Sequence, residues 1–164
     1  MANSLQRFEA ITRALARLPR QEPATQPAAE TPTLHPFDLR NIHPSLPPKV
    51  KRLFDDGHFA EATFHAFKFL DNKVRKLSAL AKSGFALMMD AFDGAQPKIK
   101  LNDMKTISEK DEQAGYRFVF AGGMQGIRNP RGHEDAVEDD PDTCLDHLSF
   151  VSMLLRRMEQ AGYK

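Results

Sequence analysis

The stretch GIRNPRGHED, residues 126–135, combines side chains that can act together on a phosphodiester. Arg128 supplies a planar guanidinium fork that binds two phosphate oxygens at once. His133 supplies an imidazole that exchanges protons near neutral pH, and Asn129 supplies an amide that can orient the imidazole or bond to phosphate. RNA carries its own nucleophile, the ribose 2′-hydroxyl. These groups therefore predict RNA cleavage that requires no metal ion and no cofactor.

The local sequence predicts how these side chains come together. Pro130 disfavours helical geometry at Asn129, so we expect the preceding helix to end at Arg128 or Asn129. Gly132 permits an unusual turn directly before His133. Guanidinium, amide and imidazole would then project from one bend of the chain.

The spacing of Arg128 and His133 carries little information by itself. With 12 arginines and 6 histidines, chance gives about one such pair in a chain of this length, and Arg52–His58 is a second match. Arg52 is followed by Leu53 and has the character of a surface residue, whereas Arg128 is followed by a polar residue and a helix-ending proline. The alternative for Arg128 and His133 is a structural one, in which both pair with nearby acids.

The elements that must position this stretch are predicted to be helices. Apolar residues recur at intervals of three and four over residues 47–55, 58–81, 83–92, 111–128 and 142–162. Ser83 is a candidate helix cap, and residues 97–108 are expected to form a small strand pair or a loop. The sequence therefore predicts an all-α bundle of four or five helices.

Three glycines precede Arg128 on the predicted helix over residues 111–128. Gly122, Gly123 and Gly126 are costly inside a helix. We expect them to permit close backbone approach, either to a neighbouring helix of this chain or to a second copy of it.

The first 45 residues differ in composition from the rest. Residues 1–18 form the N-terminal segment, in which residues 3–18 are predicted to be a basic, amphipathic helix. Such a helix is suited to docking on the rest of the chain or on a partner and, less well, to contact with a membrane surface or nucleic acid. Eight of the 11 prolines lie between Pro19 and Pro48, so residues 19–45 are predicted to be a Pro-rich linker that becomes an extended, packed segment from Leu34. Residues 46–164 form the predicted helical domain.

Composition excludes several classes of protein. The 23 basic and 22 acidic residues leave a net charge of +1, which argues against coating nucleic acid by bulk charge. No apolar run is long enough to span a membrane, and a secretory signal is absent from the predicted N-terminal helix. Cys144, the single cysteine, excludes an internal disulfide and a cysteine-based zinc site. We expect a cytoplasmic protein without membrane contact.

Several separate stretches resemble one known family. They are LFDDGHFAEATFHAFKFLDNKVR, DEQAGYRFVFAGGMQG, IRNPRGHE and EDDPDTCLDHLSFVSMLLRRME, which together cover about residues 46–160. They resemble the Ymh-type family, which is placed in the HEPN superfamily of ribonucleases. The superfamily's hallmark is an arginine and a polar residue followed at short range by a histidine.

The resemblance implies a helical homodimer whose paired arginines and histidines meet at the two-fold axis. The implied activity is metal-independent endoribonuclease action in toxin–antitoxin, abortive-infection or other anti-phage systems. Carried over by position, Arg128 and His133 are the catalytic pair and Asn129 is the polar helper. Arg131, Glu134 and Glu61 are weaker candidates for RNA contact or histidine orientation.

Two features depart from the pattern. Some HEPN toxins carry a modifiable tyrosine two residues after the histidine, where this chain has Asp135. Residues 134–146 also hold seven acids and no base, and such a cluster repels RNA at long range. This segment is either a solvated loop or an autoinhibitory or docking surface.

Two further functions remain open at this stage. The chain could be a non-catalytic dimerisation or adaptor module in a defence complex, or a domain that binds RNA without cleaving it. A partner such as an antitoxin or sensor would bind through residues 1–18 or through the acidic segment 134–146.

Overall fold

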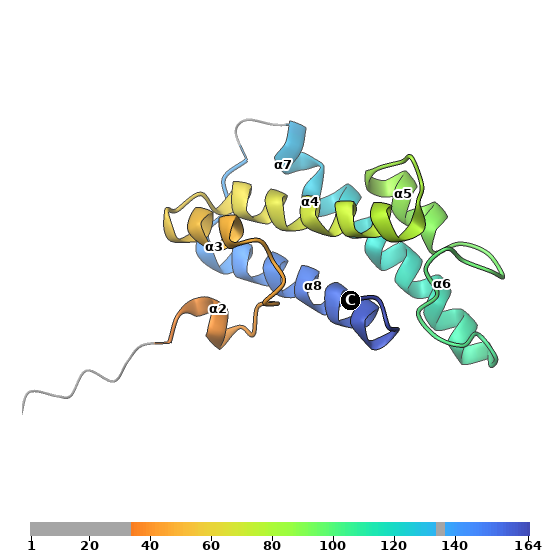
Figure 1. The fold of residues 1–164 in the computed structure, drawn as a ribbon. Coiled ribbons are helices and arrows are strands. Elements are labelled where there is room, and N and C mark those ends of the chain that lie inside the picture. Colours follow the sequence, from red (N-terminus) through yellow and green to blue (C-terminus); the bar gives the residue numbers. More distant parts are fainter. Residues whose placement is uncertain (1–33, 134–136) are drawn as a thin grey trace, which may run out of the picture. The chain divides into compact units, whose positions relative to one another are not determined.

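The computed structural model describes residues 34–133 and 137–164 of the chain. The predicted N-terminal helix, the linker up to residue 33 and Glu134 lie outside this range. The described residues form seven α-helices, one π-helical turn and no strand, so the all-α prediction is confirmed (Figure 1). In chain order the elements are α2 (Pro36–Leu39), α3 (Pro48–Asp55), α4 (Phe59–Ser78), α5 (Gly84–Ala91), α6 (Ile107–Gly122), η1 (Gly123–Arg128), α7 (Pro130–His133) and α8 (Pro141–Gln160). The count exceeds the predicted four or five because α2 and α7 are single turns.

The core is built on α4 and α8, which pack along each other (Figure 1). Each helix buries the stripe that its apolar spacing predicts. On α4 the fully buried side chains include Ala66, Phe67, Leu70 and Val74; on α8 they include Leu148, Val151, Leu155 and Met158. None of the helices in the described ranges has the length and apolar character needed to cross a bilayer.

The end of α4 and the start of α5 are fixed by backbone geometry and by one buried acid. The helix ends at Ser78, three residues before the predicted end, because Ala79 turns into the left-handed region with φ of 56°. The predicted cap Ser83 does occupy the N-cap position of α5, but its side chain makes no capping hydrogen bond. Instead the amide of Gly84 donates to the carboxylate of Asp71, which is 3% exposed. Gly84 has φ of 61°, a conformation that favours glycine.

Residues 34–45 are packed on the body, although they are not simply extended as predicted. They include the single turn α2, after which Ile42 and His43 are buried. The amide of His43 donates to Ser152 Oγ at 2.9 Å, and its Nε2 lies 3.0 Å from a Glu159 carboxylate oxygen. Both partners lie on α8, so this segment extends the bundle.

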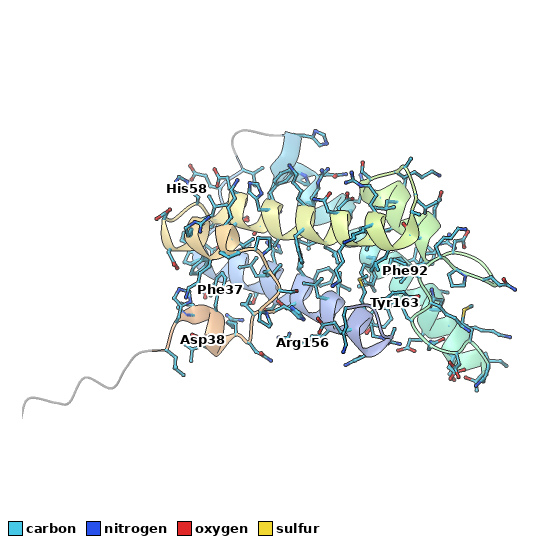
Figure 2. The ribbon with its side chains drawn as sticks, in the orientation of Figure 1. Phe37, Asp38, His58, Phe92, Arg156 and Tyr163 are labelled. Carbon is cyan, nitrogen blue, oxygen red and sulfur yellow. The ribbon has the colours of Figure 1, made fainter. Side chains whose placement is uncertain are left out.

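Residues 97–106, before α6, form a loop and no strand pair. Of the two alternatives that the sequence left open for residues 97–108, the loop is therefore the one observed. Phe92, labelled in Figure 2, stacks on Phe120 with ring centroids 4.3 Å apart. The buried amide of Gln113 donates to the carbonyls of Phe92 and Ile99, at 3.1 and 3.0 Å, and accepts from the amide of Leu101 at 2.8 Å. One polar side chain thus replaces the hydrogen bonds that a strand partner would supply.

The helix that leads to the candidate site begins earlier than predicted. Thr106 and Glu109 form a capping box, in which each side chain binds the other's backbone amide. This places the start of α6 at Ile107, four residues before the predicted start. The helix runs to Gly122 and continues as η1.

The glycines before Arg128 play different parts. A Cβ added at Gly123 would lie 2.8 Å from Phe150 Cε1 and 3.0 Å from Phe67 Cε1, so the predicted close approach is confirmed there. At Gly122 and Gly126 no atom of the described residues lies within 4 Å of such a Cβ. The expectation of an intramolecular contact is therefore wrong at these two positions.

We predict that Gly123→Ala destabilises the protein by about 1–3 kcal/mol, because the two phenyl rings must move out of a packed core. Gly115→Ala is the matched control, since Gly115 lies inside α6 with open space around it. That change should be neutral or stabilising, as alanine favours helix. Urea unfolding followed by circular dichroism measures both; equal effects would contradict the packing role of Gly123.

Candidate active site

Arg128 is the last residue of the π-helical turn that prolongs α6. The amide of Asn129 donates to the carbonyl of Met124 at 3.0 Å, five residues back. The chain then restarts with Pro130 at the first position of α7, where the missing N–H needs no partner. The predicted helix end at Arg128 is confirmed. The expectation that Asn129 leaves helical geometry is wrong: its φ is −64° and its ψ is −44°.

The Arg128 side chain lies against an aromatic ring of α4. Its guanidinium carbon is 5.1 Å from the centroid of Phe64, within the range of cation–π attraction. Nη1 donates to Asn129 Oδ1 at 3.1 Å, and among the described residues the buried Nε has no hydrogen-bond acceptor. No described carboxylate forms an ion pair with Arg128. The guanidinium is thus positioned by a ring and an amide and retains its charge for another anion.

His133 ends α7 and is exposed, with no hydrogen bond to another described residue. Gly132 acts differently from the prediction, since it has ordinary helical backbone rather than an unusual turn. A Cβ at Gly132 would lie 2.8 Å from Phe64 Cε2, so glycine is needed for contact with that ring. Phe64 therefore touches both halves of the RNPRGH sequence and holds Arg128 and the turn bearing His133 against one helix.

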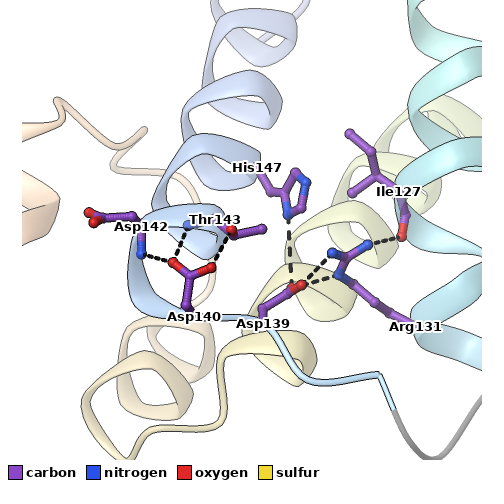
Figure 3. A network of polar contacts seen from close by, with 7 residues as sticks. All are labelled: Ile127, Arg131, Asp139, Asp140, Asp142, Thr143 and His147. Atoms are coloured by element: carbon purple, nitrogen blue, oxygen red, sulfur yellow. Dashed lines mark hydrogen bonds and ion pairs between the residues drawn. The ribbon is translucent and has the colours of Figure 1, made fainter.

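Arg131 is bound inside the protein, in contrast to the RNA contact proposed for it from sequence. Its Nε donates to Asp139 Oδ2 at 2.6 Å, its Nη2 pairs with Oδ1 of the same carboxylate, and its Nη1 donates to the Ile127 carbonyl at 2.8 Å (Figure 3). The two charged side chains are only 10% and 4% exposed. All three guanidinium nitrogens are used in this contact, which ties the bend after η1 to the segment before α8.

His147 lies beside this ion pair (Figure 3). Its Nδ1 is buried, is 3.9 Å from Asp139 Oδ2 and has no hydrogen-bond partner among the described residues. Burial lowers the pKa of His147 and the Arg131 charge lowers it further, against the opposing effect of Asp139. The folded protein therefore favours the neutral imidazole.

Several acids in residues 134–146 have structural roles. Asp140 caps α8 by accepting the amides of Asp142 and Thr143, at 2.9 and 3.0 Å. Arg40 pairs with Asp146 at 2.8 Å and with Asp142 at 3.7 Å. Together with Asp139, these residues account for four of the seven acids, and the cations that pair with them are Arg40 and Arg131.

Glu61 lies in the first turn of α4, one helical turn before Phe64, and is exposed. Its carboxylate is 4.0 Å from His58 Nδ1, and both residues line a hollow of about 380 Å³ together with Glu138 and Asp139. The structure thus places Glu61 beside the residues around His58, and no described contact joins it to Arg128 or His133.

Cys144 and the described acidic side chains show neither an activated thiol nor a metal-binding cluster. Burial raises the pKa of the Cys144 thiol to about 11, so the thiolate is disfavoured near neutral pH. In the described part of the chain no three His, Cys, Asp or Glu side chains are grouped as metal ligands.

We predict that Asp139→Asn destabilises the protein by about 3 kcal/mol, because it leaves the buried Arg131 guanidinium without a counter-charge. Asp103→Asn is the control, since it removes an ion pair to Lys105 that is open to solvent. Thermal unfolding should show a large loss for the first variant and little change for the second. A melting temperature unchanged by Asp139→Asn would contradict the clamp.

His147 should make stability depend on pH. Its pKa is lowered in the folded state, so below the unfolded value of about 6.5 protons bind preferentially to the unfolded chain. Stability should therefore be fullest above that pH and decrease as the pH falls to 5. The melting temperature of His147→Gln should decrease less between pH 7.5 and pH 5 than that of the wild type. Equal decreases in the two proteins would contradict the role of His147.

No curated protein and no solved structure matches the chain. Residues 40–158 match a family described as Protein of unknown function (Hypoth_ymh). This range includes α3 to α6, the π-helical turn, α7 and nearly all of α8. The chain therefore belongs to the Hypoth_ymh family.

Proposed function

We propose that this protein is a metal-independent endoribonuclease of the HEPN type. Arg128 and His133 are its catalytic residues, and Asn129 holds the guanidinium in place. Two copies of the chain supply the two Arg–His pairs of one cleft. The resemblance in sequence points to a toxin or abortive-infection effector that acts on RNA in the cytoplasm during phage defence.

The chemistry is an intramolecular transesterification, in which phosphorus exchanges its bond to the 5′-oxygen for a bond to the 2′-oxygen. One imidazole removes the proton of the 2′-hydroxyl, whose oxygen attacks the adjacent phosphorus. The other imidazole protonates the leaving 5′-oxygen. The guanidinium forks stabilise the charge that develops on the non-bridging oxygens. The products are a 2′,3′-cyclic phosphate and a 5′-hydroxyl end.

The difference between two neighbouring arginines is the observation that carries this proposal. The guanidinium of Arg131 donates all its contacts to Asp139 and to the Ile127 carbonyl. Arg128, three residues earlier, has no carboxylate partner among the described residues and rests on the Phe64 ring. An arginine that serves only the fold would be expected to pair as Arg131 does. Arg128 instead forms an ion pair with no carboxylate of the described residues, so we take its guanidinium as the group that would bind a phosphate.

A homodimer would complete the site. A single Arg–His pair supplies one proton-transfer group, whereas in-line cleavage uses an acid and a base on opposite sides of the phosphate. Two-fold symmetry provides both because the same patch meets itself. The open space around Gly122 and Gly126, on the segment that leads into Arg128, leaves room for a partner's backbone.

We predict that His133→Ala and Arg128→Ala each reduce RNA cleavage by at least about 100-fold without unfolding the protein. Arg52→Ala and His58→Ala are matched controls, since they alter the same residue types at similar spacing on an exposed surface. RNA integrity in expressing cells and cleavage of purified RNA in EDTA provide the measurements.

Three results would count against this proposal. If the wild type leaves every RNA class intact and both variants behave as it does, the proposed activity is wrong. Retention of RNA without cleavage, weakened by salt, would assign the protein instead to RNA binding alone. A drop in the melting temperature of Arg128→Ala would show that Arg128 supports the fold.

A further inference from the structure

A basic face runs along α4 on the side away from the core. His65, Lys68, Asn72 and Lys76 recur at intervals of three and four residues, so they share one face of the helix. Lys68, Asn72 and Lys76 are exposed, and none of the lysines on this helix forms an ion pair with a described residue. The acid inside this stretch, Asp71, is buried and paired with Arg75 at 2.6 Å. Between His65 and Lys76 the exposed face therefore carries positive side chains and no exposed acid.

The face begins next to the candidate active site. The ring of Phe64, which carries the Arg128 guanidinium, lies 5.7 Å from the ring of His65 in an edge-on arrangement. Burial lowers the pKa of His65, and the charges of Lys49 of α3 and of Lys68 lower it further, against the opposing charge of Glu61 one turn earlier on α4. A chain of contacts thus leads from Arg128 through Phe64 to a group of cations.

The face ends in an apolar hollow. The hollow measures about 340 Å³ and is lined by Phe69, Asn72, Lys73, Lys76, Leu77 and Lys164. Its floor is formed by the half-buried Phe69 and Leu77, while amino groups surround it. The Oδ1 atom of Asn72 accepts a hydrogen bond from Arg75 at 2.9 Å, which leaves the Asn72 amide nitrogen to donate elsewhere.

We propose that this face of α4 binds single-stranded RNA, with a base seated on Phe69 and the flanking phosphates on Lys73 and Lys76. An aromatic platform inside a positively charged groove is the common design for single-stranded nucleic acid, because every base offers a π-face. The Asn72 amide nitrogen can donate to a base edge or a sugar. From Phe64 to Lys76 the helix rises about 18 Å, so the strand would extend from the cleavage site over several nucleotides.

This inference rests on the proposed function, because it treats the strand on α4 as the substrate of Arg128 and His133. It adds a binding determinant outside the Arg–His pair. The lysines compensate for a chain with a net charge of only +1 by concentrating positive charge where the strand lies.

The test measures binding of a fluorescent, 2′-O-methylated oligoribonucleotide, which lacks the nucleophile, to the full-length wild-type protein by anisotropy. Phe69→Leu keeps the apolar volume and removes the ring, and should weaken binding at least about fivefold. The double variant Lys73→Gln with Lys76→Gln should make the plot of log affinity against log salt less steep. Its slope should be less negative by about 1.4, which corresponds to the loss of two phosphate contacts. Lys100→Gln with Lys110→Gln is the control, since these exposed lysines lie off this face.

Binding by both sets of variants at the affinity of the wild type would overturn the inference. A second pair of results would also overturn it: polyglutamate displaces the oligoribonucleotide as effectively as unlabelled RNA does, and Phe69→Leu binds the oligoribonucleotide as the wild type does. Together these results would indicate an acidic protein partner instead. Cleavage assays separate this inference from the proposed activity. If the α4 variants bind and cleave RNA normally, only the proposed α4 site is rejected. If the wild type never cleaves RNA but the α4 variants lose RNA binding, only the proposed nuclease activity is rejected.

Discussion

The buried ion pair between Arg131 and Asp139 is the interaction on which the candidate site depends. The turn that carries His133 is a single turn, α7, with no buried residue of its own. A turn this short cannot hold its position by hydrophobic burial. The carboxylate of Asp139 binds it from one side and Phe64 meets Gly132 from the other. A side chain proposed for proton transfer requires such external support on so small an element, because proton transfer tolerates little displacement.

The site and the core share side chains instead of occupying separate regions. Phe64 stands on the helix that fills the core, yet its ring faces Arg128. Gly123 admits Phe150 and Phe67 where α6 gives way to the π-helical turn. Packing of the aromatic side chains therefore sets the direction of the guanidinium, and the stability of the bundle and the geometry of the site are coupled through a few rings.

The sequence allowed the helices to be predicted because apolar spacing reports directly on which face is buried. It allowed the N-cap of α5 at Ser83 to be predicted, but not the hydrogen bond from Gly84 to Asp71, thirteen residues earlier, that supports it. The end of α4 was predicted three residues too late, because the left-handed alanine at which it ends has no local signal. Arg128 and His133 were proposed as site residues from residue types and resemblance, and that assignment stays a prediction. The roles of Arg131 and Asp139 were missed because a buried ion pair between an arginine and an acid eight residues later has the same sequence pattern as a solvated loop.

The π-helical turn has a consequence for how this chain tolerates insertions and deletions. A π turn contains one residue more than the α-helical turn it replaces. Loss of a single residue between Gly123 and Arg128 would let regular α-helical winding return, while the side chains beyond it kept their direction relative to α6. Loss of a residue from the regular part of α6 would instead rotate every later side chain by about 100° around the helix axis. Arg128 would then leave the Phe64 ring, so a change in length should be tolerated better inside the π-helical turn than before it.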